Sequence, residues 1–303
     1  MKYLFISLVI FFGQSLFAQD FKNHYIQIPP GGLYDFLSPT EKPFPLVSAH
    51  RGGKNIPGNP ENSIETFDYT LFFNYAMIEF DISMSKDGVL LLMHDRSLDR
   101  TTNGNGLVKE KTWKEISTLF LVDDEERLTI YRVPSLSRTL EWLKGKTIAS
   151  LDIKREVPVE QVIKMVEQKH VEDYVIIITY NVEDAQKVYA INPKLMISLG
   201  IRNEEELEKW KASGIPSKNI LAFTGTNRKT ADFYQKLHEE GILCIQGTMG
   251  NIDGQAAAKG EHIYQQLIEM GVDILATDRP REAENVCKKV RDKDHPHSSY
   301  LKH

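Results

Sequence analysis

Residues 174–199 read YVIIITYNVEDAQKVYAINPKLMISL: an apolar run, an amphipathic stretch of helix length and a second apolar run. Two strands joined through a helix lie parallel in one sheet, because the crossover must return the chain to the starting edge. The same alternation continues from residue 147 to the end of the chain, which predicts an α/β fold. The expected strands are Thr147–Ile153, Tyr174–Thr179, Leu195–Leu199, Asn219–Phe223, Ile242–Gln246 and Val272–Ala276, and the expected helices are Glu160–Lys169, Val182–Ala190, Glu204–Lys211, Lys229–Glu240 and Ala256–Glu269.

Three earlier apolar runs bring the strand count to nine: Pro45–Ala49, Met77–Ile82 and Leu90–Met93. The connection between the last two reads SMSKDGV, which has no room for a helix and contains a turn signal. We therefore expect an antiparallel hairpin there, which leaves eight parallel strands. Eight strands alternating with helices predict a (β/α)8 TIM barrel.

The register of this hairpin follows from its turn. A two-residue turn at Lys86–Asp87 places Glu79 opposite His94, whereas a bulge at Gly88 shifts the pairing by one residue.

Residues 96–146 interrupt the alternation with glycine-rich and acidic patches. Insertions of this length in a regular barrel are usually functional, so we expect a cap over the active face; a disordered loop is the alternative. Trp113, Ile116, Leu119 and Phe120 have helical spacing and favour a packed segment. The chain after residue 18 is thus expected to form one barrel domain, 19–303, with the cap inserted after the hairpin.

The N-terminus reads MKYLFISLVIFFGQSLFAQD, with a positive start, a short apolar run and a small residue at Ala18. This layout predicts a signal peptide, residues 1–18, and export to the periplasm or the extracellular space. Leu16 is larger than the residue usual three positions before the cut, and an uncleaved anchor is the alternative. We expect no stable membrane insertion of the mature chain and no bridge between Cys244 and Cys287.

The composition limits the partners. Lys and Arg number 37 against 42 Asp and Glu, giving a net charge of −5 without a basic block, so a nucleic-acid partner is not expected. A small-molecule substrate is the expected partner, and the sequence gives no oligomeric state.

Acidic residues gather at the ends of the early strands. Glu79 and Asp81 alternate on one strand and point to the same side, into the barrel. Buried carboxylates repel each other unless a cation joins them, and Asp152 on the next strand supplies a third. These oxygens predict a site for one divalent metal ion, Mg²⁺ or Ca²⁺. The alternative is a set of buried salt bridges with Arg51 and Lys154.

Two histidines and two cations lie beside these acids. His50 and His94 can exchange protons near neutral pH and can serve as an acid–base pair. Asp95 either orients a ring or caps a turn. Arg51 and Lys154 suit phosphate oxygens, and no Ser or Cys nucleophile stands out. This set of groups favours displacement at a phosphodiester, where positioning and charge stabilisation supply the catalysis.

The motifs and their spacing resemble the glycerophosphodiester phosphodiesterase family. The resemblance extends from about residue 46 to 285 and is thin between 155 and 265. It rests on His50-Arg51-Gly52, Pro60-Glu61-Asn62, Glu79-Phe80-Asp81, Lys86-Asp87-Gly88, His94-Asp95, Arg100-Thr101-Thr102-Asn103-Gly104, Leu151-Asp152-Ile153-Lys154, Gly271-Val272-Asp273 and Thr277-Asp278-Arg279-Pro280.

The resemblance implies a barrel with an inserted cap and a divalent metal held by Glu79, Asp81 and Asp152. It implies acid–base catalysis by the two histidines, and it places phosphate or substrate contacts at Arg51, Lys154 and Glu61. The expected reaction, part of lipid metabolism, releases an alcohol and glycerol phosphate. In related phospholipases a substrate hydroxyl attacks phosphorus first and water then opens a cyclic phosphate.

Two positions depart from the family pattern. The family usually has Glu where this chain has Asp152, which shortens the carboxylate reach by about 1.5 Å. The late aromatic strand of the family, usually carrying a Trp, reads ILCIQGTMGN here, so the alcohol recognised need not be plain glycerol. The segment 247–254 could equally be an ordinary strand-to-helix loop.

Three other functions remain open. A lysophospholipase D or phosphoinositide-type phosphodiesterase would need an apolar rim, for example from Trp113, Phe120 and Tyr131. A non-catalytic phosphodiester-binding relative would bind metal without turnover. A sugar-isomerase-type metal barrel would leave Arg51 and Lys154 unexplained.

Overall fold

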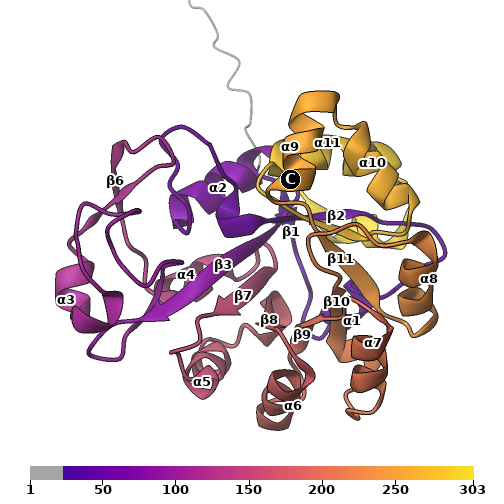
Figure 1. The fold of residues 1–303 in the computed structure, drawn as a ribbon, viewed down its shortest axis with the longest axis horizontal. Coiled ribbons are helices and arrows are strands. Elements are labelled where there is room, and N and C mark those ends of the chain that lie inside the picture. Colours follow the sequence, from indigo (N-terminus) through magenta and orange to yellow (C-terminus); the bar gives the residue numbers. More distant parts are fainter. Residues whose placement is uncertain (1–22) are drawn as a thin grey trace, which may run out of the picture.

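Eight parallel strands form a closed barrel in the computed structural model, which describes residues 23–303 (Figure 1). The predicted signal peptide, residues 1–18, lies outside the described residues. The sheet order runs through all eight strands and closes by pairing β2 with β3, which confirms the predicted (β/α)8 barrel. The barrel strands are β2 (Leu46–Ala49), β3 (Met77–Met84), β7 (Ala149–Ile153), β8 (Val175–Thr179), β9 (Met196–Gly200), β10 (Ile220–Phe223), β11 (Leu243–Gly247) and β12 (Ile274–Thr277).

Helices surround this barrel, and several of them begin at a side-chain cap. Asn181, Asn203 and Thr230 each accept a hydrogen bond from the backbone two or three residues into the helix that follows. The apolar faces of the helices pack on the strands and form the main core. The surrounding helices are α2 (Ile64–Phe73), α4 (Leu136–Leu143), α5 (Val159–Lys169), α6 (Val182–Ile191), α7 (Glu204–Lys211), α8 (Ala231–Glu239), α9 (Asn251–Lys259), α10 (His262–Glu269) and α11 (Pro280–Val290).

The single helix expected over Ala256–Glu269 is wrong, because the segment forms two helices. Gly260 separates α9 from α10 and has a φ of 110°, a conformation that residues with a side chain rarely adopt. The apolar periodicity continues across this glycine, so it did not reveal the break.

The hairpin after β3 is present, and its register is the one expected with a bulge at Gly88, one residue away from that of a two-residue turn. Strand β4 (Leu90–Leu92) pairs antiparallel with β3, with Ile82 opposite Leu92. The loop contains three residues rather than two, because Gly88 takes a φ of 81° and its N–H bonds to the carbonyl of Ser85. Glu79 therefore does not lie opposite His94. The shift is the one expected of a glycine bulge.

The inserted segment is folded. It contains α3 (Trp113–Ile116) and a hairpin of β5 (Phe120–Val122) and β6 (Leu128–Arg132), and it ends at α4, which packs on the barrel. Trp113 and Tyr131 pack against a small core of its own. That core comprises Leu91, Met93, Leu98, Val108, Ile116, Leu121 and Val133.

The residues before β2 cover the amino ends of the barrel strands. Strand β1 (Tyr25–Ile26) pairs with the C-terminal strand β13 (Leu301–Lys302), and α1 (Leu33–Phe36) follows it. Phe36 is 1% exposed. Its cluster includes residues at or near the starts of five strands: Leu46, Met77, Ile148, Ile176 and Met196.

We expect Phe36→Ala to lower the free energy of unfolding by about 3–5 kcal/mol, because it opens a cavity between α1 and the barrel. Urea unfolding followed by tryptophan fluorescence measures this change. Leu128→Ala, at a side chain that is 58% exposed, is the matched control and should change stability by less than about 0.5 kcal/mol. An equal effect of the two substitutions would show that α1 does not contribute to the core.

The expected lack of a bridge between the cysteines is confirmed, since both are free thiols; both are also buried. None of the helices within residues 23–303 has the length and apolar character needed to cross a membrane.

Candidate active site

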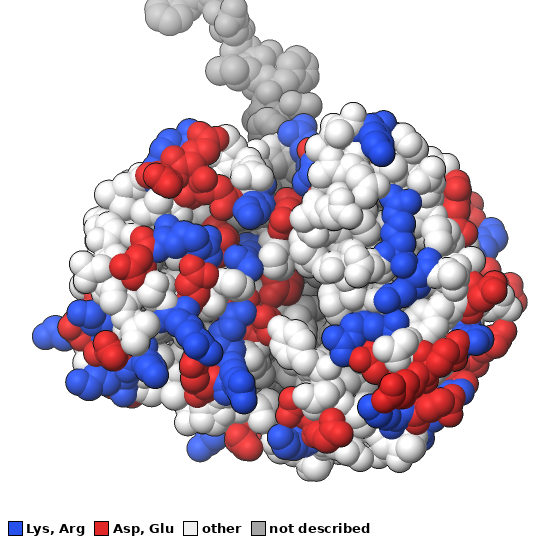
Figure 2. Space-filling model, in the orientation of Figure 1, with Lys and Arg blue, Asp and Glu red and all other residues white. Residues whose placement is uncertain are grey.

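The predicted site residues meet at the carboxyl ends of the first barrel strands. His50 and Arg51 follow β2, Glu79 and Asp81 lie on β3, and Asp152 lies opposite Asp81 on the neighbouring β7. Parallel strands bring their ends to one edge of a barrel, so residues far apart in the sequence become neighbours. Figure 2 shows acidic side chains at the bottom of the central hollow, with Lys and Arg side chains around it.

Three carboxylates form a tight cluster. One oxygen each from Glu79, Asp81 and Asp152 lies within 4.8 Å of the other two, and all three side chains are buried or nearly so. Lys154 Nζ donates to Asp81 Oδ1 at 2.6 Å and to Asp152 Oδ2 at 2.8 Å. Arg51 Nε lies 3.3 Å from Asp81 Oδ2. The salt bridges that the sequence offered as an alternative are therefore present for two of the three acids.

Glu79 is the acid without a cationic partner. Among residues 23–303, the hydrogen bond that it receives comes from the backbone N–H of Arg51, at 2.9 Å from Oε2. Burial and the neighbouring charge of Asp81 raise the pKa of Glu79 from 4.5 to about 8. When Glu79 is ionised, the three carboxylates carry more negative charge than the two side-chain cations of the cluster neutralise.

This arrangement fits a hard divalent cation. Such ions take carboxylate oxygens, and a cation among these three would satisfy Glu79. Tyr180 Oη donates to Asp152 Oδ1 at 2.8 Å and fixes the orientation of that carboxylate. This fit rests on the charge of the three carboxylates and on the chemistry of their oxygens as metal ligands.

His50 is oriented by a carboxylate from the far end of the chain. Its Nδ1 lies 2.7 Å from Asp278 Oδ1, so its Nε2 is left for a substrate. Burial lowers the pKa of His50, but the hydrogen bond that its Nδ1 donates to Asp278 and the charge of Glu79 outweigh burial and raise it.

His94 has the same kind of support. Its Nδ1 lies 2.6 Å from Asp95 Oδ1, so Asp95 orients the ring. Arg100 donates to Asp95 and holds the pKa of that carboxyl well below its usual range. Arg100 also donates to Glu61, which pairs with Arg51. A continuous chain of contacts therefore joins His94 to Arg51 and the acidic cluster.

The backbone at two motif positions is held in the left-handed region. Arg51 has a φ of 53° and Asn62 a φ of 56°, which are uncommon for residues with a side chain. The Asn62 amide donates to Asp81 Oδ2 at 2.7 Å and accepts from the backbone N–H of Asp81 at 3.0 Å. These contacts fix the position of Asp81 from outside its own strand.

A cavity of about 410 Å³ opens beside His50, Glu79 and Asp152. Its wall away from these groups comes from the later strands and their loops, and includes Arg202, Phe223, Asn227, Lys229, Ile245 and Met249. Met249 and Ile245 thus stand where the family resemblance led us to expect an aromatic strand.

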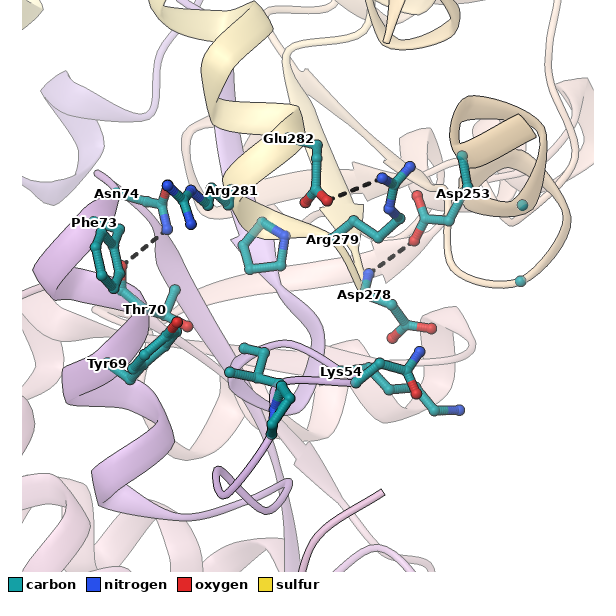
Figure 3. A pocket seen from close by; sticks show the side chains of 17 residues that line it. Lys54, Tyr69, Thr70, Phe73, Asn74, Asp253, Asp278, Arg279, Arg281 and Glu282 are labelled. Carbon is teal, nitrogen blue, oxygen red and sulfur yellow. Dashed lines mark hydrogen bonds and ion pairs between the residues drawn. The ribbon is translucent and has the colours of Figure 1, made fainter. Parts of the chain in front are cut away.

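A second cavity of about 540 Å³ lies behind Asp278, between α2, α9 and α11 (Figure 3). Here Arg279 pairs with Glu282, and the Asp278 backbone N–H donates to Asp253. These contacts hold the loop that presents Asp278 to His50.

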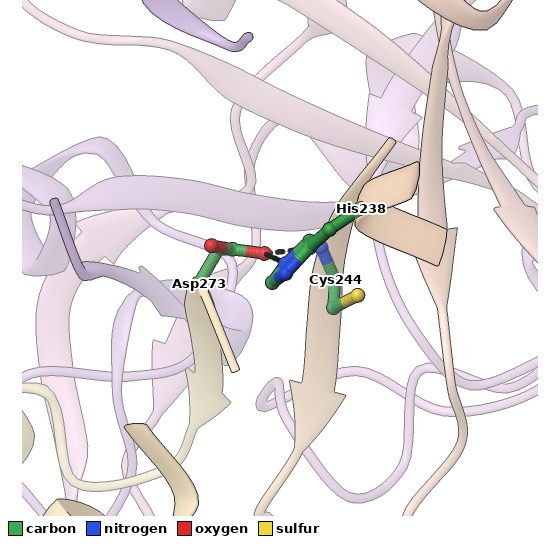
Figure 4. A group of neighbouring side chains, drawn as sticks. All are labelled: His238, Cys244 and Asp273. Carbon is green, nitrogen blue, oxygen red and sulfur yellow. Dashed lines mark hydrogen bonds and ion pairs between the residues drawn. The ribbon is translucent and has the colours of Figure 1, made fainter. Parts of the chain in front are cut away.

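A third group, His238, Cys244 and Asp273, lies at the outer side of the barrel wall (Figure 4). His238 and the backbone N–H of Cys244 both bond to Asp273 Oδ2. Figure 4 shows the sulfur directed away from Asp273, and burial raises the pKa of the thiol far above its usual value. The two hydrogen bonds to Asp273 join the members of this group to one another, so we interpret the group as structural.

Sequence reasoning assigned no role to Asp278 and did not identify Tyr180. Asp278 belongs to one of the motifs that carry the family resemblance, but its partner His50 is 228 residues away in the sequence. Tyr180 follows β8 and is 59% exposed, and no local pattern distinguishes it from an ordinary loop tyrosine.

The fold and this site place the chain among the barrel enzymes that act on phosphate esters. The glycerophosphoryl diester phosphodiesterase family model matches residues 50–282. The glycerophosphodiester phosphodiesterase of Caldanaerobacter subterraneus is 35% identical over 252 residues, covering 80% of this chain and 98% of that protein.

Solved structures agree. The crystal structure of a glycerophosphoryl diester phosphodiesterase from Parabacteroides distasonis has a TM-score of 0.85 at 32% identity, covering 93% of this chain and 99% of that one. An Oleispira antarctica phosphodiesterase in complex with the product sn-glycerol-3-phosphate has a TM-score of 0.64 at 18% identity and covers 84% of this chain and 99% of that one, which shows the shared fold. The chain belongs to the glycerophosphoryl diester phosphodiesterase family and is a phosphoric diester hydrolase.

Proposed function

We propose that the chain hydrolyses glycerophosphodiesters to an alcohol and glycerol phosphate, using one divalent metal ion and His50 and His94 as the acid–base pair. The observation that carries this proposal is the acidic cluster with one unpaired member, Glu79, next to a histidine oriented by its own carboxylate.

The residues that would hold the metal are Glu79, Asp81 and Asp152, and either Mg²⁺ or Ca²⁺ suits their oxygens. When bound, the ion would supply positive charge for the phosphate oxygens and for the negative charge that develops on them. The shorter Asp152, held by Tyr180 and Lys154, is the ligand through which this chain would differ from the usual family site.

The histidines would move the protons. In each ring Nδ1 is engaged by an aspartate, so Nε2 is the nitrogen available to the substrate. An aspartate at Nδ1 fixes the ring orientation. One histidine would take a proton from the glycerol hydroxyl that attacks phosphorus, and the other would give one to the leaving alcohol. Water would then open the cyclic phosphate with the two proton transfers reversed, which yields glycerol phosphate.

Arg51 and Lys154 would orient the phosphate. Both lie at the acidic cluster, and the exposed fractions of their side chains are 18% and 22%, so a substrate can reach them. The Glu61 side chain is 5% exposed and pairs with Arg51 and Arg100. We propose that Glu61, expected among the substrate-binding residues, acts by positioning Arg51.

The experiment that tests this proposal follows glycerol phosphate release by phosphorus NMR from glycerophosphodiesters of glycerol, choline, ethanolamine and inositol. We expect the glycerol phosphate signal to grow as the diester signal declines, with one phosphorus product per diester consumed. For the choline, ethanolamine and inositol diesters, release of the alcohol phosphate together with free glycerol would contradict the assigned cleavage. Absence of hydrolysis of every diester would overturn the function.

We expect Tyr180→Phe to weaken metal binding by about tenfold, because a group that orients a ligand carboxylate typically contributes 10- to 100-fold. Calorimetric titration of metal-stripped protein with Mg²⁺ or Ca²⁺ measures the affinity. Tyr69→Phe, at a tyrosine on the outer face of α2, is the matched control. Equal affinities for Tyr180→Phe and the unmodified chain would remove Tyr180 from the site.

We also propose export of the chain after cleavage behind Ala18, supported by the charged and apolar pattern of residues 1–18. Amino-terminal sequencing of protein recovered from the medium or periplasm should begin at Gln19. A mature protein that still begins at Met1 would contradict cleavage.

A further inference from the structure

The wall of the active-site cavity opposite the acidic cluster is basic. Arg202 follows β9 and Lys229 follows β10, and both line the same cavity of about 410 Å³ as Glu79 and Asp152. Figure 2 shows Lys and Arg side chains along the side of the hollow that α8 borders. One cavity thus has an acidic end, where the phosphodiester is expected, and a basic end beyond it.

Lys229 is the cation of this wall that is free for a ligand. Arg202 is engaged by Glu206 through both Nε and the terminal nitrogen. Within residues 23–303, no carboxylate lies within ion-pair distance of the Lys229 ammonium. A half-buried lysine that lines a cavity and has no carboxylate within ion-pair distance attracts an anion there.

The loop that carries Lys229 is fixed by buried polar groups. Gln246, on β11, is fully buried; its amide donates to the Gly225 carbonyl at 2.7 Å, and its oxygen accepts from Tyr234 at 2.7 Å. The Lys229 backbone N–H in turn donates to the Tyr234 hydroxyl at 3.4 Å. A buried polar network of this kind specifies one loop conformation. Lys229 is therefore held at the cavity by the barrel interior.

Close packing holds the rest of the wall. A Cβ at Gly247 would come within 3.1 Å of Phe223 and Thr226 and 3.0 Å of Met249. The apolar side of the cavity, formed by Phe223, Ile245 and Met249, has no charged side chain of its own. It suits a short carbon chain that links the phosphate at one end to an anionic group at the other.

We propose that the alcohol half of the substrate carries its own anionic group, a carboxylate or a phosphate, which Lys229 binds with help from Arg202. Glycerol is neutral, so the extra charge must lie on the other alcohol. This inference rests on the proposed function and narrows its substrate class.

Three diesters with one carbon skeleton test the proposal: glycerophosphoglycerol, its glyceric acid analogue with a terminal carboxylate, and its terminal phosphate monoester. We expect kcat/KM to be at least tenfold higher for an anionic member than for the neutral one, chiefly through KM. The carboxylate and phosphate arms identify which anion is recognised. Glycerophosphocholine, with a cationic alcohol, should be the poorest substrate.

Lys229→Gln should lower kcat/KM about tenfold for the preferred anionic diester and less than twofold for glycerophosphoglycerol. Lys229→Glu should lower kcat/KM for the anionic diester further and should raise kcat/KM for glycerophosphocholine. Lys164→Gln, at an exposed lysine on α5 that lines none of the cavities described above, is the matched control and should change neither value.

Hydrolysis of all diesters without an anionic preference, or an equal loss on all of them in Lys229→Gln, would overturn this inference and leave the proposed function standing. Failure to hydrolyse any diester would overturn both.

Discussion

His50→Ala and His94→Ala are each expected to lower kcat/KM on a glycerophosphodiester by two to four orders of magnitude, the usual contribution of a positioned acid or base. Each ring is held at Nδ1 by an aspartate, so its replacement removes a proton carrier without opening the barrel core. Initial rates at saturating metal, with substrate varied around KM, measure the effect. The loss should appear mainly in kcat.

His262→Ala provides the control, because His262 is an exposed histidine at the start of α10. It should retain full activity. Circular dichroism and the midpoint of urea unfolding should be the same for all three variants. A His50 or His94 variant that keeps more than a tenth of the activity would exclude that histidine from proton transfer.

Glu79→Gln is expected to raise the stability of the metal-free protein at alkaline pH and to lower its activity. Because the pKa of Glu79 is raised to about 8 in the folded chain, the folded state holds this proton more tightly than the unfolded chain does. In metal-free protein, the stability from this group is complete below about pH 4.5 and is lost as pH rises to about 8. The neutral glutamine does not ionise, so Glu79→Gln should flatten that part of the pH profile.

Urea unfolding at pH 5 and pH 8.5 in the presence of a chelator measures this effect. Without metal, the variant should be more stable than the unmodified chain at pH 8.5. Added Mg²⁺ or Ca²⁺ should strongly stabilise the unmodified chain but not the variant. Turnover should fall about a hundredfold or more. This loss is larger than the roughly 10- to 100-fold loss expected when only a group that orients a metal ligand is removed. Asp123→Asn, at an acid held by Arg127 in the inserted segment, is a control that should leave the metal response intact. A variant that retains metal-stimulated turnover would contradict the role of Glu79.

The barrel could be predicted because strand and helix periods alternate plainly along the chain. Each apolar run from Thr147 onward became a strand, and the SMSKDGV connection correctly identified the hairpin. Details that depend on single backbone conformations were predicted less well. The positive φ of Gly88 and of Gly260 changed a register and divided a helix, and neither leaves a trace in the apolar pattern.

The acidic cluster was predictable because two acids alternate on one strand and a third lies on the neighbouring strand. The partners that orient the site were not. Asp278 reaches His50 only when the last strand closes the barrel against the first, and Tyr180 reaches Asp152 across two adjacent strand ends. Such contacts depend on closure of the fold rather than on local spacing.

The central claim is that the three carboxylates hold one cation that turnover requires. The most direct measurement titrates metal-stripped protein with Mg²⁺ or Ca²⁺ while recording glycerol phosphate release and metal binding together. We predict no turnover without metal and recovery in proportion to one bound ion per chain, with both responses lost in Asp81→Asn. Undiminished turnover in stripped protein would contradict the account.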